Sequence, residues 1–175
     1  MNRHNIIVIV ASVVIAGTLG FSASGVVVAE NIKFGASDGK DFRYFRVINS
    51  EKVAVCNPTI LYANIYDINI HMTSNGSPIG QLSLPGGFLE AGSVNVVEGV
   101  FTSESYQRIQ YLAQRFDTLS QGIILQRASP DSLIITTEVQ ANILGFIPYH
   151  ATKSYEALDF VDEINSGGAC VVKGQ

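Results

Sequence analysis

Three hydrophobic patterns follow one another along the chain, and each predicts a different element. Residues 6–29 read IIVIVASVVIAGTLGFSASGVVVA, an apolar stretch without an ionisable side chain. Residues 66–72 alternate strictly between apolar and polar, which is typical of a half-buried strand. Between Ser103 and Ser120 apolar side chains recur every three or four residues, which predicts one amphipathic helix. The chain therefore combines a hydrophobic N-terminal segment with a mostly β domain.

The apolar stretch at 6–29 is long enough to cross a membrane. As a helix it would measure about 36 Å, against a hydrocarbon layer of roughly 30 Å. We expect a single transmembrane anchor here, preceded by a short tail at 1–5. A cleaved signal peptide is the alternative, in which Arg3 forms the positive region and the small residues near Ser24 or Ala29 suit a peptidase.

The side of the membrane on which the domain lies is argued from two opposing signals. More basic residues follow the span (Lys33, Lys40, Arg43) than precede it (Arg3), which by the positive-inside rule favours a cytoplasmic domain. A very short N-terminal tail before a large folded domain is, however, the usual layout of a signal anchor with a translocated domain. We expect the domain outside the cytoplasm.

The remaining chain divides into a linker at 30–41, a domain at 42–164 and a tail rich in Gly and Cys at 165–175. Within the domain, 85–92 is expected to be a loop. Thr102 or Ser103 is expected to cap the helix, and Gly122 to end it. Strands are expected at 42–48, 53–56, 66–72, 79–84, 93–101, 123–126, 133–147 and 149–160.

Alternation and turn residues together predict two antiparallel sheets of about seven strands over a shared core. In the strand at 66–72, we expect Tyr66, Ile68, Ile70 and Met72 to face that core. The pair Asn75-Gly76 fits a hairpin turn. Two prolines interrupt strands, and they are Pro58 and Pro148.

Composition narrows the chemistry. The net charge is −4, no basic cluster occurs and Trp is absent, so nucleic-acid binding is not expected. His4, His71 and His150 lack the spacing of metal ligands, and Asp67 and His71 on one strand face would lie about 13 Å apart. We therefore expect no catalytic, cofactor-binding or metal-binding residues, and no enzymatic activity.

Cys56 and Cys170 leave two alternatives open. If they form a disulfide, they close a loop of more than 100 residues, which in the chain-entropy model contributes about 4–5 kcal/mol. Otherwise they are two unpaired thiols, with Cys56 a small core residue in a strand.

A series of short motifs within residues 42–159 resembles the folded, atypical late-embryogenesis-abundant (LEA) proteins and the water-stress-and-hypersensitive-response (WHy) domain. The motifs are VAVCNPT at 53–59, Gly-x-x-Ile-Gly at 76–80, Pro85, Leu-x-Ala-Gly-Ser at 89–93 and Gly-Phe-Ile-Pro at 145–148. We assign their framework residues structural roles. These residues are Asn57, Pro58, Gly76, Gly80, Pro85, Gly92, Gly145 and Pro148.

The resemblance implies an immunoglobulin- or fibronectin-like β-sandwich with one helix, linked to desiccation and other stress tolerance and without enzymatic activity. With an N-terminal membrane segment it points to a prokaryotic envelope protein, archaeal sources included, whose partners are other envelope proteins or lipids. Two alternatives remain. One is a secreted fibre subunit whose freed strand at 26–34 pairs with a neighbouring sheet, and the other is a lipid-binding module with an apolar groove between helix and sheets.

Overall fold

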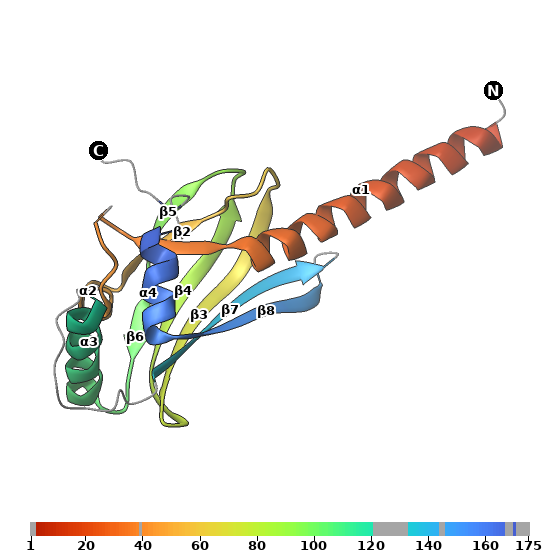
Figure 1. Ribbon diagram of the computed structural model, residues 1–175. Helices are drawn as coiled ribbons and strands as arrows, with labels where there is room; N and C mark the ends of the chain where they lie inside the picture. The colour runs from red at the N-terminus through yellow and green to blue at the C-terminus, as the bar shows by residue number, and fades with distance from the viewer. Residues whose placement is uncertain (1–2, 39, 121–132, 144–145, 167–169, 171–175) are drawn as a thin grey trace.

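The computed structural model describes residues 3–38, 40–120, 133–143, 146–166 and 170, and within them eight strands form two antiparallel sheets (Figure 1). The first sheet has the order β1 (Lys33–Ala36), β2 (Lys52–Cys56), β5 (Val94–Glu98). The second has the order β6 (Val100–Thr102), β4 (Ser77–Leu89), β3 (Ala63–Ser74), β7 (Leu133–Ile143), β8 (Ile147–Glu156). The prediction of a mostly antiparallel β fold in two sheets is confirmed.

The two sheets share one hydrophobic core. Val53 and Val55 of β2 pack in the same cluster as Ile68 and Ile70 of β3, and all four are at most 3% exposed. Burying a side chain of this size contributes about 1.5–3 kcal/mol, so the alternating strands drive the two layers together.

Four helices are present in the described residues: α1 (Arg3–Asn31), α2 (Tyr44–Ser50), α3 (Tyr106–Ser120) and α4 (Ala157–Ser166). The predicted amphipathic helix is α3, and its apolar face is buried as expected. The predicted cap positions are wrong, because α3 begins at Tyr106. Thr102 belongs to β6, and the Ser103 hydroxyl accepts a hydrogen bond from the Ser105 N–H at 3.1 Å. Gly122 lies outside the described residues.

The strand expected at 42–48 is wrong, because this segment forms α2. Tyr44, Val47 and Ile48 have the i, i+3, i+4 spacing of a helix and are all buried. The helix also receives a cap from a distant residue, since the Asp117 carboxylate accepts hydrogen bonds from the Tyr44 and Phe45 N–H groups at 2.7 and 2.9 Å. Local sequence does not contain this second contribution.

Tyr66 does not face the core, because a β-bulge interrupts the alternation in β3. The β3–β7 register shifts between Ile65 and Asp67, so Ile65 is buried and Tyr66 is 50% exposed, whereas the rest of the predicted face is buried. Gly86 on β4 lies against this bulge. A Cβ at Gly86 would be 2.1 Å from the Ile65 carbonyl oxygen, so only glycine fits there.

Replacing Gly86 by alanine is expected to lower the free energy of unfolding by about 2–3 kcal/mol, because the methyl group overlaps backbone that cannot move without breaking the sheet. Gly87→Ala is the matched control, since a Cβ at Gly87 meets nothing within 4 Å. Denaturant titration of both variants in detergent measures the difference. Equal stabilities would show that the close approach at Gly86 is not present.

Four other strand predictions need correction. The strand expected at 93–101 is two strands in different sheets, and Gly99 joins them where a Cβ would lie 2.3 Å from the Ser83 carbonyl. The loop expected at 85–92 is strand as far as Leu89. Pro148 does not interrupt a strand but pairs with Asn142 in β8, an edge strand where a missing N–H is tolerated. The strand region at 149–160 ends at Glu156, where α4 follows.

Three predicted features fall wholly or partly on residues that are not described. The strand at 123–126 lies outside the described residues, as does Gly145. The long strand at 133–147 is described as far as Ile143, where β7 ends.

The expected linker at 30–41 is wrong, because β1 occupies its middle. Phe34 and Ala36 are each 8% exposed, and β1 pairs with β2 in the register Phe34 to Val55. The free strand proposed for a fibre at 26–34 is also wrong, since residues as far as Asn31 are helical and β1 already pairs within its own chain.

Candidate functional site at the anchor end of the sandwich

The N-terminal part of α1 exposes apolar side chains all round. Those of Ile6, Ile7 and Ile15 are 43–66% exposed, and the helix as far as Ala23 projects from the sandwich (Figure 1). By length and composition α1 is the one helix in the described residues that is able to cross a membrane, over Asn5–Asn31. An exposed apolar surface of this size marks contact with a membrane or another protein.

The last two turns of α1 belong to the domain core. Ser24, Val28 and Ala29 of α1 are between 0% and 8% exposed, and this part of the helix packs on β3, β7 and β8. Ile32, directly after the helix, is buried as well. At Gly25 the helix comes close to β7, where a Cβ would lie 3.9 Å from the Cβ of Ala141. The hydrophobic helix is therefore joined to the sandwich by packing and not by a flexible segment.

A polar contact fixes the same end of α1 to the edge strand. The Tyr149 hydroxyl of β8 donates a hydrogen bond to the Glu30 carboxylate. This bond and the neighbouring charge raise the pKa of Tyr149 above its usual value. Sequence analysis missed this pair, since Glu30 and Tyr149 are far apart in the chain and neither belongs to a motif.

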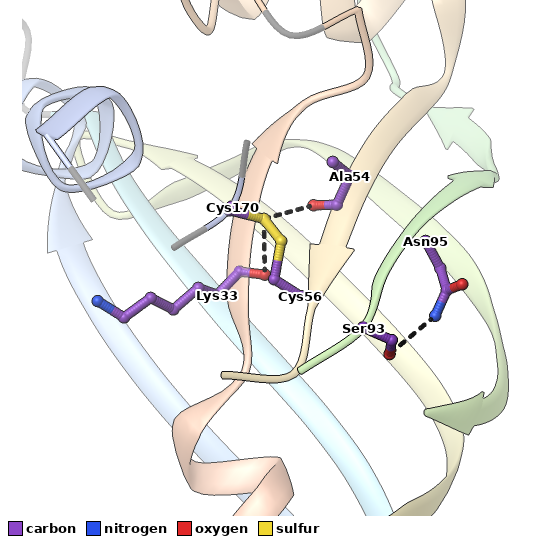
Figure 2. Close-up of a disulfide and its surroundings, with 6 residues drawn as sticks. All are labelled: Lys33, Ala54, Cys56, Ser93, Asn95 and Cys170. Atoms are coloured by element: carbon purple, nitrogen blue, oxygen red, sulfur yellow. Dashed lines mark hydrogen bonds between the residues drawn. A yellow bond between two sulfur atoms is a disulfide. The ribbon is translucent and has the colours of Figure 1, made fainter. Parts of the chain in front are cut away.

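Cys170 lies against the outer face of the smaller sheet, in a small buried cluster with Ala54 and Cys56. Cys56 and Cys170 form a disulfide with their Cα atoms 5.5 Å apart, which is the first of the two alternatives that the sequence left open (Figure 2). The Cys170 sulfur lies 3.7 Å from the Lys33 carbonyl oxygen and 3.8 Å from that of Ala54. Cys170 is thus held on β1 and β2, and β1 follows directly after α1.

Asn57 connects two loops at this end. Its side-chain N–H₂ group donates to the carbonyl oxygens of Leu61 and Glu90 at 2.7 and 3.0 Å, and its oxygen accepts from the N–H and hydroxyl of Thr59. Asn57 is 0% exposed. The Asn57 side-chain amide therefore makes its hydrogen bonds to groups of the chain itself. This agrees with a structural role for Asn57-Pro58.

Replacing Asn57 by alanine is expected to lower the free energy of unfolding by about 2–3 kcal/mol, because buried backbone groups lose their partners. Asn64→Ala is the control, since Asn64 is exposed on the neighbouring strand. Thermal or denaturant unfolding in detergent measures both. A loss for Asn57→Ala no larger than that for Asn64→Ala would contradict the role of this amide.

The remaining framework residues are distributed over the sandwich and do not form a site. Gly76 and Gly92 have φ angles of 77° and 65°, which suit glycine in turns. At Gly80 a Cβ would lie 2.6 Å from the Phe101 ring. Pro85 pairs with Asp67 beside the bulge.

The apolar face of α3 leaves no room for a lipid. Ile109, Leu112 and Phe116 are 1–4% exposed and fill the space against the rest of the core. The hollow of about 660 Å³ that α3 shares with α2 is lined mainly by residues with polar or charged side chains, among them Arg43 and Arg46. The described residues therefore contain no apolar groove between α3 and the sheets.

Asp117 of α3 is buried below this hollow, and its ionisation is linked to stability. Burial raises the pKa of Asp117 above 3.8, although the Phe45 and Tyr44 N–H groups and the nearby arginines act in the opposite direction. A raised pKa means that the folded state binds the proton more tightly. The resulting stability is fully present below pH 3.8 and is lost as the pH rises through the folded-state pKa.

The unfolding free energy of the wild type, minus that of Asp117→Asn, is therefore expected to increase as the pH is lowered from 7 towards 4. The substitution keeps the side-chain shape but cannot ionise, so it isolates this single group. Denaturant titrations at several pH values measure the difference. A difference that decreases on acidification would show that the ionised carboxylate is the stabilising form.

Two histidines that are distant in sequence contact the same glutamate, Glu138, on the outer face of the larger sheet. His150 hydrogen-bonds through Nδ1 to Glu138, and His71 Nε2 lies 3.7 Å from the other carboxylate oxygen. Asp67 instead accepts a hydrogen bond from Asn69 at 2.8 Å. In the described part of the chain, no group of three His, Cys, Asp or Glu side chains is arranged to hold a metal ion.

No protein-family model and no curated protein matches this chain. Its structural neighbours include the solution structure of a protein provisionally described as late embryogenesis abundant, which is 16% identical, with a TM-score of 0.27 over 91% of this chain and 94% of that one. The crystal structure of a protein from Archaeoglobus fulgidus is 8% identical, with a TM-score of 0.28 over 73% and 94%. The function proposed below is therefore argued from the chain's own residues.

Proposed function

We propose that this chain is a non-enzymatic, membrane-anchored protein of the LEA/WHy type. Helix α1 crosses the cell membrane once and holds the sandwich at its outer face, where the domain protects or binds other envelope components under water stress. The motifs in residues 53–93 support the family, and their structural arrangement around Asn57 supports a role through the folded surface and not through reactive groups.

The proposed anchoring is supported mainly by a change in side-chain exposure along α1. Its first part exposes apolar side chains, and its last part is core. Peptidase cleavage after Ala29 would remove Val28 and Ala29 from that core, which favours a retained anchor over a cleaved leader. Cleavage after Ser24 would leave both residues in place, so the mass of the mature N-terminus has to decide this point.

The disulfide supports the outer location of the domain. Disulfides persist in oxidising compartments and are rare in the cytosol of most organisms. The cross-link is buried in the folded domain, and it supports the outer location in spite of the excess of basic residues after the span.

Labelling of intact cells tests anchoring and sidedness together. Every lysine follows α1, and Lys40 and Lys52 are exposed. A membrane-impermeant amine reagent is expected to modify them without lysis, in a membrane-bound protein that retains residue 1. Modification only after lysis would contradict the outer location, and a mature chain that begins after Ser24 or Ala29 would contradict the anchor.

Drying of vesicles tests the protective role. Proteoliposomes that contain the full chain are expected to retain more of an encapsulated dye after drying and rehydration than protein-free vesicles. Vesicles with an unrelated single-pass protein at equal density are the control for the presence of a helix. Equal leakage from all three preparations would contradict protection of the membrane.

A further inference from the structure

Several segments of the sandwich lie at the end of the larger sheet where α1 leaves the domain. The registers pair Ile65 with both Gly87 and Ala141, and Ala141 lies beside Gly25 of α1. The chain before β3, the end of β4, the end of β7 and the start of β8 therefore lie together at one end of the larger sheet. Figure 1 shows α1 leaving the sandwich at this end.

This end exposes large apolar side chains. The exposed fractions are 89% for Ile60, 52% for Tyr62, 56% for Phe88, 73% for Phe146 and 45% for Ile147, and we call these five residues the loop end. The rings of Tyr62 and Phe88 stack with their centroids 6.0 Å apart. Exposed apolar and aromatic side chains are thus found on the segments that lie at the end where α1 leaves the sandwich.

Charge is absent from the same segments. Residues 57–62, 84–89 and 139–149 contain no Asp, Glu, Lys or Arg. A charged side chain close to hydrocarbon is costly, whereas Tyr and other aromatic side chains are enriched at membrane interfaces. The composition of these segments therefore fits a lipid environment better than open water.

The length of the free part of α1 places the bilayer surface at this level. From residue 6 to residue 23 the helix measures about 27 Å, close to the roughly 30 Å thickness of a hydrocarbon layer. The next residues, Ser24 and Gly25, are already packed against β7. The hydrocarbon boundary thus coincides with the loop end.

We propose that the loop end enters the interfacial layer of the bilayer that α1 spans, so that the sandwich stands on the membrane in one orientation. The proposal rests on the anchoring proposed above. It assigns lipid as the partner of Ile60, Tyr62, Phe88, Phe146 and Ile147. Helix α3 lies at the far side of the domain and stays in water (Figure 1).

Tryptophan fluorescence tests the proposal, because the chain contains no Trp and each introduced indole is the only one. Phe88→Trp and Phe146→Trp place it at two exposed positions of the loop end. Tyr111→Trp is the control on α3, where Tyr111 is 65% exposed. The full chain is reconstituted in nanodiscs whose lipids carry bromine on the upper acyl carbons, and in unbrominated nanodiscs for comparison.

The expected result is an emission maximum at shorter wavelength and a loss of at least about half of the intensity in brominated lipid for both loop-end variants, and neither for Tyr111→Trp. If the chain inserts into nanodiscs but the loop-end indoles emit as in water, the present proposal fails and the anchoring stands. Failure of the chain to enter nanodiscs would overturn both proposals.

Discussion

Reduction of the Cys56–Cys170 disulfide is expected to lower the free energy of unfolding by about 4–5 kcal/mol, the largest single effect that the structure predicts. The bond joins residues 114 positions apart, and in the chain-entropy model a loop of this length greatly restricts the unfolded chain. Both sulfurs are buried, so the folded domain retains its packing while the unfolded state gains freedom.

Denaturant titration of the full chain in detergent, with and without reductant, measures this loss. Cys170→Ala is the control, because its stability should not respond to reductant at all. An unchanged transition for the wild type on complete reduction would show that the cross-link does not restrict the unfolded chain. Cys170 would then contribute to the fold only through its contacts with β1 and β2.

Replacing Val28 by asparagine is expected to lower the free energy of unfolding of the sandwich by about 3–4 kcal/mol. Val28 is 0% exposed in the common core, so the new amide loses its hydration and the core loses an apolar side chain. Val27→Asn is the matched control one residue earlier. Val27 is 41% exposed, and we expect a loss below about 1 kcal/mol there.

The difference in stability between the two variants distinguishes a helix end that is packed in the core from a flexible tether. If residues 24–31 only connected the membrane to the domain, both substitutions would have the same small effect. The measurement is denaturant unfolding of the sandwich in nanodiscs, followed by far-UV circular dichroism. Similar losses for Val27→Asn and Val28→Asn would contradict the packing of α1.

Sequence pattern predicted the sheets well where one face of a strand is buried. In β3 and β7 the polarity of each residue follows from the side of the sheet on which it lies, so alternation identifies the strand. The prediction for Tyr66 is wrong because of a bulge in β3. A bulge changes which side of the sheet a residue faces, and the alternation of apolar and polar residues does not reveal it. The pair Gly86-Gly87 is the sequence feature that lies opposite the bulge, and two adjacent glycines also fit the loop expected at 85–92.

Elements that depend on distant partners were not predictable in this way. Residues 44–48 fit a helix as well as a strand, and the cap that favours the helix is Asp117, which is 73 positions from Tyr44. Likewise, Ser24 and Ala29 suggested a peptidase site, although in the structure they are buried in the part of α1 that packs on the sandwich. Small side chains suit a peptidase site as well as close packing of a helix on a strand, and only the fold distinguishes the two.

The central claim is that the end of α1 is packed on the sandwich, and an engineered disulfide between Gly25→Cys and Ala141→Cys tests it most directly. The Cβ positions lie 3.9 Å apart, within the range of about 3.5–4.5 Å found in disulfides. Gly20→Cys with Ala141→Cys is the control, since a Cβ at Gly20 meets nothing within 4 Å. We predict a cross-link for the first pair under mild oxidation and none for the second. Equal cross-linking of both pairs, or none in either, would contradict the account.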